Sequence, residues 1–265
     1  MKQRIITAVI AAAIFIPLVI LGNLPFLLLI YLMATIGLYE LQKMKKMPLS
    51  SFSSLLSFIL LWAALVPEQH GGMFGYIYQH KLQIFLLGVL IYLIYTVVTK
   101  NSFTFDDAGF LSISVLYVGM GFYYMFETRQ EGTNGLYYLF YALFTIWATD
   151  SGAYFFGKAM GKRKLWPEIS PNKTIEGFIG GIICALIVSI LFYFFSDLEH
   201  SAVKLLLISI LISVFGQMGD LVQSAYKRHY GVKDSGRLLP GHGGILDRLD
   251  SLIFILPILQ ILNLF

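Results

Sequence analysis

Long apolar runs separated by short polar segments dominate the pattern of this chain. An α-helix needs about 20 apolar residues to cross the hydrocarbon core of a bilayer, and these runs approach that length. We therefore expect an all-α polytopic membrane protein with about nine transmembrane helices. The expected spans are 4–22, 25–41, 52–67, 82–99, 108–126, 135–157, 177–195, 203–223 and 249–264. The third is short, and a re-entrant segment is the alternative there.

Lysine and arginine are distributed unevenly between the two sets of loops that these spans define. If the N-terminus lies in the cytoplasm, only Lys81, Arg129 and Lys204 fall on the outer side. The other 16 fall on the cytoplasmic side: Lys2, Arg4, Lys43, Lys45, Lys46, Lys100, Lys158, Lys162, Arg163, Lys164, Lys173, Lys227, Arg228, Lys233, Arg237 and Arg248. An excess of basic residues is typical of cytoplasmic loops. The bias predicts a cytoplasmic N-terminus and an extracytoplasmic C-terminus.

The composition excludes an ordinary soluble domain. Of the 265 residues, 57% are hydrophobic and 13% are charged, whereas soluble proteins have about 25% charged residues. The net charge of +4 follows from the basic inner loops, so we expect no nucleic-acid partner. Cys184 is the only cysteine, which excludes an intrachain disulfide.

Two basic loops rich in glycine and proline, Lys158–Glu176 and Lys227–Arg248, lie in the second half of the chain on the cytoplasmic side. The outer loops are brief, and no soluble domain or internal repeat is visible. We expect one membrane domain over 1–265, with 1–130 mainly as scaffold helices and 135–265 as catalytic helices and cytoplasmic loops.

Asp220 lies near the cytoplasmic end of an apolar span. A carboxylate at mid-membrane costs roughly 2.5–3.5 kcal/mol, and less near a helix end, so it needs a cation or a polar cavity. Helical spacing places Gln217, Ser224, Lys227 and Arg228 on the same face. This row of polar residues along one helix face suits an anionic ligand together with a metal ion. For Asp220, a structural salt bridge between helices is the alternative.

Asp247 and Asp250 share a face at the start of the last expected helix. Carboxylates from two helices, such as Asp220 and Asp247, can jointly hold Mg²⁺, which prefers oxygen ligands. Capping of the helix N-terminus is the alternative for either residue. Arg248 lies between them in the sequence and therefore on a different face of the expected helix, where it can be a solvated cytoplasmic charge.

The sequence Pro240-Gly-His-Gly-Gly precedes this helix. Gly243 and Gly244 allow close backbone approach, so that their N–H groups can face a phosphate. An ordinary turn is the alternative, and His242 can equally be a packing residue.

Asp150 is a further carboxylate inside an expected span, and a loop lysine is its expected partner in a structural interpretation. Downstream, Thr174 can cap the next helix, with Glu176 in its first turn. Lys173 would lie beside the positive end of that helix, where anions bind. A solvated lysine before a capped helix is the alternative. Together these residues indicate a cytoplasm-facing site for a polyphosphate, with acidic metal ligands and basic phosphate contacts.

The segment from Ser224 to Asp250 (SAYKRHYGVKDSGRLLPGHGGILDRLD) closely resembles the signature of phosphatidate cytidylyltransferases, also called CDP-diacylglycerol synthases. The resemblance extends to DSGAYFFGK from Asp150, to SPNKTIEG from Ser170, and to the length and all-helical layout. It covers effectively the whole chain.

The resemblance implies that CTP and phosphatidic acid react to give CDP-diacylglycerol and pyrophosphate in phospholipid biosynthesis. Asp220 and Asp247 would hold Mg²⁺, with support from Asp250; a second metal or a monovalent cation is also compatible. The expected phosphate contacts are Lys173, Lys227, Arg228, Lys233, Arg237 and Arg248, with backbone donors at Gly243 and Gly244. The resemblance includes Ser224, His242 and Asp150 in the site without separate roles. It also implies a homodimer in the plasma membrane of a bacterium.

Two other functions would use some of the same features. A CTP- or ATP-dependent lipid kinase would need the same metal and basic residues. A proton-coupled transporter would carry polar residues along a path through the bilayer and show inverted repeats, whereas here the carboxylates gather at the inner ends of the helices.

Overall fold

The computed structural model describes residues 2–68, 71–196, 198 and 200–265. Helices make up most of this part of the chain. Their bounds are α1 Lys2–Leu21, α2 Asn23–Met44, α3 Phe52–Ala64, α4 Gly72–Gln79, α5 Lys81–Val98, α6 Phe105–Gln130, α7 Gly135–Met160, α8 Ile175–Phe195, α9 Ala202–His229 and α10 Leu246–Ile261. Two short strands, β1 Lys164–Trp166 and β2 Ser170–Thr174, pair antiparallel.

Each expected span coincides with one of these helices, which confirms an all-α membrane architecture. Five of the described helices (α2, α5, α6, α8 and α9) are long and apolar enough to cross a membrane. The apolar part of α1 (Ile6–Leu21) and all of α3 are shorter. The 13 residues of α3 extend over only about 20 Å. The number of spans and the orientation of the two ends therefore stay predictions.

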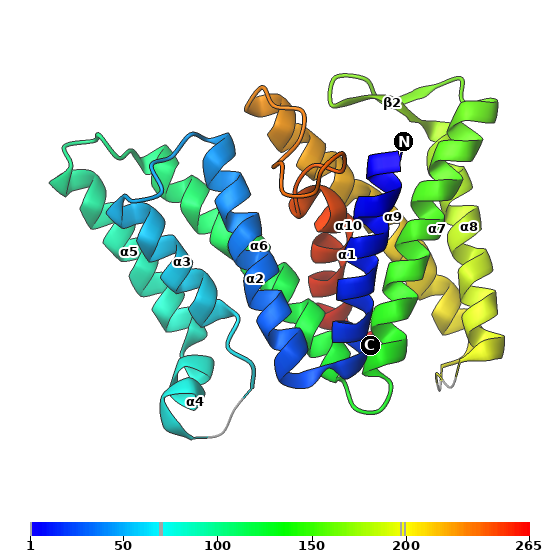
Figure 1. The fold of residues 1–265 in the computed structure, drawn as a ribbon, viewed down its shortest axis with the longest axis horizontal. Helices are drawn as coiled ribbons and strands as arrows, with labels where there is room; N and C mark the ends of the chain where they lie inside the picture. Colours follow the sequence, from blue (N-terminus) through cyan, green and yellow to red (C-terminus); the bar gives the residue numbers. More distant parts are fainter. Residues whose placement is uncertain (1, 69–70, 197, 199) are drawn as a thin grey trace.

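Consecutive long helices run back and forth between the same two ends of the molecule (Figure 1). The N-terminus, the β1–β2 hairpin and the loop between α9 and α10 lie at one end, and α4 lies at the other. α6 packs against α2, α3 and α10 and so connects the two sides of the molecule. The shared apolar core includes Phe26, Leu111, Phe122 and Leu139, all fully buried.

Small residues let α7, α8, α9 and α10 approach closely. A side chain at Gly152 on α7 would meet the Cys184 sulfur on α8. One at Gly219 on α9 would meet the Asp250 carbonyl on α10. Membrane helices often pack through such small residues, because dispersion contacts replace the hydrophobic effect there. This packing brings the helical segments that contain Asp150, Asp220 and Asp250 together.

Three local features differ from the expectations. α4 lies in the segment expected as a plain outer loop, and β1 and β2 form within the basic loop Lys158–Glu176. α9 continues to His229 beyond the expected end of the span at 223. Lys227 and Arg228 therefore lie on the same helix as Asp220, as their helical spacing predicted, and not in the loop. The capping prediction is confirmed: the Thr174 hydroxyl accepts a hydrogen bond from Gly177 N–H at 3.1 Å.

Candidate active site

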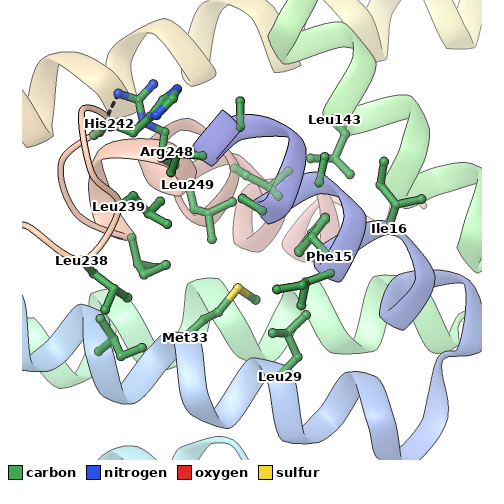
Figure 2. A pocket seen from close by; sticks show the side chains of 18 of the residues that line it. Phe15, Ile16, Leu29, Met33, Leu143, Leu238, Leu239, His242, Arg248 and Leu249 are labelled. Atoms are coloured by element: carbon green, nitrogen blue, oxygen red, sulfur yellow. Dashed lines mark hydrogen bonds between the residues drawn. The ribbon is translucent and has the colours of Figure 1, made fainter. Parts of the chain in front are cut away.

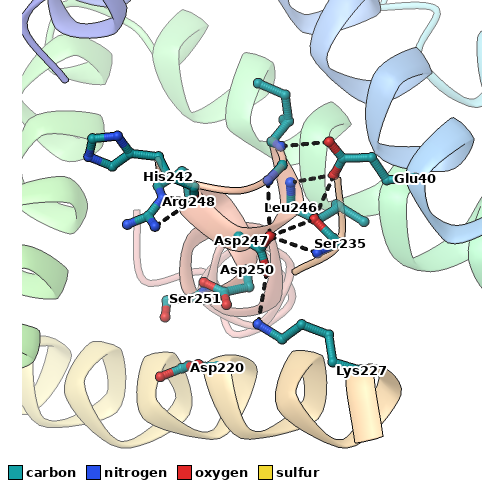
Figure 3. A network of polar contacts seen from close by, with 12 residues as sticks. Glu40, Asp220, Lys227, Ser235, His242, Leu246, Asp247, Arg248, Asp250 and Ser251 are labelled. Atoms are coloured by element: carbon teal, nitrogen blue, oxygen red, sulfur yellow. Dashed lines mark hydrogen bonds and ion pairs between the residues drawn. The ribbon is translucent and has the colours of Figure 1, made fainter. Parts of the chain in front are cut away.

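The sequence-predicted site residues converge at the end of the molecule that carries the hairpin. α9 contributes Asp220 and Lys227, β2 contributes Lys173, and α7 contributes Asp150. The segment 230–245 leads from α9 to Asp247 and Asp250 in the first turns of α10 (Figure 3). Two basic loops far apart in sequence therefore meet at one place.

Asp247 organises the segment before α10. Its Oδ1 accepts a charge-assisted hydrogen bond from the Lys227 ammonium at 2.8 Å. Its Oδ2 accepts from Ser235 N–H at 2.8 Å, the Ser235 hydroxyl at 3.0 Å and Gly244 N–H at 3.0 Å. Its side chain is only 5% exposed.

The pKa of the Asp247 carboxyl reflects these contacts; the residue precedes the expected span that begins at Leu249. Burial alone would raise this pKa, but the hydrogen bond from Gly244 N–H and the charge of Lys227 outweigh burial. The pKa lies below its ordinary value, so Asp247 is an anion at neutral pH.

Glu40 on α2 is a second buried carboxylate at this segment, and sequence reasoning missed it (Figure 3). Its carboxylate accepts hydrogen bonds from Ile245 N–H at 2.9 Å and Leu246 N–H at 3.0 Å, and it lies 2.8 Å from the Ser235 hydroxyl, whose one proton it shares with Asp247. The residue is 1% exposed. An acidic residue within an expected apolar span was the available signal, the same signal that identified Asp220.

Gly243 and Gly244 are needed for close approach, although their N–H groups are engaged inside the segment. Gly243 has φ +89°, and a Cβ there would meet Asp247 Oδ2; a Cβ at Gly244 would meet the Glu40 carboxylate. Gly243 N–H donates to the Leu239 carbonyl at 3.1 Å, and Gly244 N–H donates to Asp247. Donation by either glycine to a phosphate stays a prediction.

Asp220 is joined to the other basic loop. The Lys173 ammonium lies 2.6 Å from Asp220 Oδ2, and it also reaches the Gln217 carbonyl at 3.5 Å. The Asp220 side chain is 36% exposed, so a ligand can reach it. This ion pair holds β2 against α9.

Asp150 and Asp250 complete a group of three carboxylates from three helices. Asp150 interacts electrostatically with Asp220, Lys173 and Arg248. Asp250 interacts with Asp220, Lys227 and Asp150. Asp250 is 8% exposed, and one of its oxygens accepts from Ser251 N–H at 2.8 Å. A loop lysine, Lys173, is thus near Asp150 as expected. The ion pair that Lys173 forms is with Asp220 and not with Asp150.

The remaining predicted residues lie around this group. Arg228 donates to the Ile169 carbonyl in the hairpin at 3.2 Å. Arg248 donates to the His242 carbonyl from Nε at 2.8 Å and from Nη2 at 2.6 Å. Ser224 is half-buried on α9, whereas Lys233 and Arg237 are exposed. Neither of these two side chains forms a hydrogen bond or ion pair with the described residues.

The oxygen donors fit a divalent cation of the Mg²⁺ type. Asp220 and Asp247 each present one carboxylate oxygen to a lysine ammonium, so both oxygens already face a cation. The described residues contain no group of three His, Cys, Asp or Glu side chains arranged to hold a metal ion. Mg²⁺ is commonly held by one or two carboxylates together with water and substrate phosphates, which matches a site of this kind.

The charges suit a polyphosphate. Lys173 and Lys227 form ion pairs with Asp220 and Asp247, and Arg248 interacts electrostatically with Asp150. Lysine and arginine side chains also bind phosphate oxygens through charge-assisted hydrogen bonds. This combination of carboxylates and cations is chemically suited to a phosphate-rich ligand together with a divalent cation.

Comparison with known proteins gives a consistent result. The family described as "Cytidylyltransferase family" matches residues 2–265. The chain is 54% identical over 262 residues to the phosphatidate cytidylyltransferase of Bacillus subtilis (strain 168), covering 99% of this chain and 97% of that protein. It is 51% identical to that of Staphylococcus haemolyticus (strain JCSC1435), and the alignment covers 99% and 98%. The protein of the same name from Staphylococcus aureus (strain COL) is 50% identical with the same coverage.

Proposed function

The chain belongs to the cytidylyltransferase family, and from this membership and the site geometry we propose how its residues catalyse the reaction. The function is transfer of CMP from CTP to phosphatidic acid, which gives CDP-diacylglycerol and pyrophosphate for phospholipid synthesis. The observation that carries this conclusion is 54% identity over 99% of the chain. The site supplies the charges that such a reaction requires.

In the proposed reaction, a phosphate oxygen of phosphatidic acid attacks the α-phosphorus of CTP. The new bond joins this oxygen to the α-phosphorus, the bond to the oxygen that bridges the α- and β-phosphates breaks, and pyrophosphate leaves with that oxygen. The lipid phosphate is already an anion at neutral pH, so no protein nucleophile is required. Catalysis then comes from positioning and from stabilising the charge that develops.

Asp220 and Asp247 are the proposed ligands of Mg²⁺, with Asp250 in support. Both present an oxygen that faces a cation, and Asp220 is the more accessible of the two. A bound Mg²⁺ would supply Lewis-acid polarisation and a template for the phosphates. A second metal or a monovalent cation is compatible with the Asp150 carboxylate beside them.

The basic side chains are the proposed phosphate contacts. Lys173 and Lys227 now neutralise the two aspartates, and they lie where triphosphate oxygens would compete for them. Arg228 and Arg248 hold backbone carbonyls at the rim of the site. The exposed Lys233 and Arg237 would attract the anionic nucleotide, while Ser224, His242, Gly243 and Gly244 contribute polar contacts.

We propose nine spans with the N-terminus and the active site on the cytoplasmic side and the C-terminus outside, in a bacterial plasma membrane. Support comes from the excess of basic residues in the proposed inner loops. The N-terminus and the site segments also lie at the same end of the molecule. In this proposed topology the site would face the compartment that contains CTP, at the depth of a lipid headgroup. The family resemblance further suggests a homodimer, which light scattering of the purified protein can test.

The test uses purified protein in detergent with Mg²⁺, phosphatidic acid and CTP labelled at either the α- or the γ-phosphorus. We expect α-label in a CDP-lipid and γ-label in pyrophosphate. In a parallel reaction with diacylglycerol in place of phosphatidic acid, transfer of the γ-label to that lipid alcohol, together with no CDP-lipid from phosphatidic acid, would instead identify a lipid kinase. Omission of phosphatidic acid is the control and should leave both labels in CTP.

A further inference from the structure

An apolar cavity of about 440 Å³ lies beside the candidate active site, between α1, α2, α7 and α10 (Figure 2). Its volume falls within the roughly 300–1,000 Å³ of typical ligand sites. Aliphatic and aromatic side chains line almost all of it, among them Phe15, Leu29, Met33 and Leu143. Leu32 and Trp147 also line it and are 58% and 48% exposed, so the cavity is accessible at its edges.

The sequence of α1 creates this space. Ala8, Ala11 and Ala12 line the cavity, whereas the outward face carries larger residues such as Val9 and Ile10, which are 62% and 55% exposed. Alanine on the inward face leaves the space open, because no longer side chain fills it. α1 is therefore built to cover a cavity rather than to close the core.

Only one end of the cavity is polar. Arg248 and His242 line that end, and the segment that contains His242 leads into α10. His242 Nδ1 is buried and has no hydrogen-bond partner among the described residues. Arg248 also interacts electrostatically with Asp150, so the polar end adjoins the carboxylate group of the candidate active site.

We propose that this cavity holds an acyl chain of phosphatidic acid, with the lipid phosphate at Arg248. The inference rests on the proposed function, which requires a diacyl phosphate beside the nucleotide. One cationic end and an otherwise apolar lining match the charge pattern of that lipid. A nucleotide would leave its polar groups unpaired in such a lining.

The length of the cavity agrees with this occupant. Along α1 the lining runs from Thr7 to Ile16, nine residue steps or about 13.5 Å. Half of a bilayer hydrocarbon core is about 15 Å. A chain that enters from one leaflet would thus extend along α1 with its phosphate at the level of Arg248.

The kinetic test compares Ala11→Phe, which fills the cavity, with Ala13→Phe, which makes the same change at an exposed position outside the lining. Substrates are dioleoyl- and dihexanoyl-phosphatidic acid. Displacing about two buried methylenes should lower the dioleoyl-to-dihexanoyl ratio of kcat/KM about tenfold in Ala11→Phe. The ratio should be unchanged in Ala13→Phe, and the KM for CTP should be unchanged in both.

A labelling experiment with the wild-type protein tests the site without a substitution. Phosphatidic acid with a diazirine at the end of one acyl chain should crosslink to residues deep in the cavity, such as Phe15, Ile16 and Leu29. Excess unlabelled phosphatidic acid should remove this label. Crosslinks confined to the outward residues Val9 and Ile10 would overturn the proposal.

The outcomes separate this inference from the proposed function. A wild-type protein that makes no CDP-lipid from either substrate contradicts the function, even if the cavity is labelled. An active wild type whose chain-length ratio is the same in Ala11→Phe contradicts the acyl-chain site alone. If Ala11→Phe does not fold, the labelling result decides.

Discussion

Two lysine–aspartate pairs define the candidate active site at the scale of single residues. Lys173 pairs with Asp220, and Lys227 pairs with Asp247. The Asp247 carboxylate accepts hydrogen bonds from Ser235 N–H and Gly244 N–H in the segment before α10. The Asp220 side chain, in contrast, is 36% exposed. The two aspartates therefore differ in their surroundings. Asp220 is accessible to a ligand, whereas Asp247 holds the segment between α9 and α10 in its conformation.

Replacing Asp220 with Asn tests its role as a metal ligand. The loss of a negative oxygen should lower kcat by at least the roughly 100-fold that follows removal of one transition-state electrostatic contact. It should also raise the Mg²⁺ concentration that gives half-maximal rate. Asp106→Asn, at an exposed position in the first turn of α6, is the control. A near-normal rate in Asp220→Asn would remove this residue from the metal site.

Replacing Glu40 with Gln tests the buried carboxylate that sequence reasoning missed. Ile245 N–H donates to one oxygen of the Glu40 carboxylate and Leu246 N–H to the other. A carboxamide has only one acceptor oxygen, so one buried donor should lose its partner. The expected loss is about 1–3 kcal/mol in the free energy of unfolding, seen as a lower unfolding temperature in detergent. Glu131→Gln, at an exposed position, should leave that temperature unchanged. An equal temperature for both variants would show that Glu40 does not hold the segment.

Sequence reasoning identified the residues that the structure brings together, because charges near apolar helix ends stand out. It could not assign their partners, since Lys173 reaches Asp220 across 47 positions and only the fold determines that contact. Glu40 was missed because it lies outside the charged loops, although it carries the same signal as Asp220.

At the scale of elements, the segment between α9 and α10 depends on glycine. Gly231 and Gly243 both have positive φ, but only Gly243 lies against Asp247. A Cβ added at Gly231 would meet no atom of the described residues within 4 Å. The two glycines therefore separate backbone strain from contact with the carboxylate.

Gly243→Ala and Gly231→Ala therefore form a matched pair. Alanine at positive φ destabilises each by about 1 kcal/mol or more. Only Gly243→Ala should also displace the Asp247 carboxylate, and so only this variant should lose most of its kcat. Steady-state rates and unfolding temperatures of both variants are the measurements. An equal loss of kcat in Gly243→Ala and Gly231→Ala would show that backbone strain, and not contact with the Asp247 carboxylate, causes the loss.

The elements themselves were largely predictable from hydrophobic run length, and Thr174 marked the start of α8 correctly. The end of α9 was not predictable from hydropathy, although the spacing of the polar residues from Gln217 to Arg228 indicated one helical face. Its last turn is polar, and hydropathy places the boundary where the apolar run ends, whereas the helix continues through Lys227 and Arg228. The β1–β2 hairpin has only three and five residues, too few for a clear alternating pattern.

At the scale of the whole molecule, the proposed topology can be tested in intact cells. In a Cys184→Ser background, Lys164→Cys lies in the hairpin and Thr133→Cys lies in the loop between α6 and α7. An impermeant thiol reagent should label Thr133→Cys in intact cells, and Lys164→Cys only after lysis. The opposite result would place the candidate active site outside the cell.

The sequence predicts the membrane class, and the bias of basic residues predicts its orientation. The arrangement of helices around α6 and the cavity under α1 were not accessible in this way. Both arise from which side chains meet in space, such as the alanines of α1, which line the same cavity as Met33 and Leu249. Such contacts depend on packing between helices that hydropathy does not specify.

The fate of oxygen in the reaction tests the central claim most directly. Phosphatidic acid labelled with ¹⁸O in its phosphate should react with CTP and Mg²⁺ so that one ¹⁸O bridges the two phosphorus atoms of CDP-diacylglycerol. The released pyrophosphate should contain none, because the lipid oxygen attacks and the CTP oxygen leaves. Mass spectrometry of both products gives the answer. ¹⁸O in pyrophosphate, or no CDP-lipid at all, would contradict attack of the lipid phosphate on the α-phosphorus of CTP.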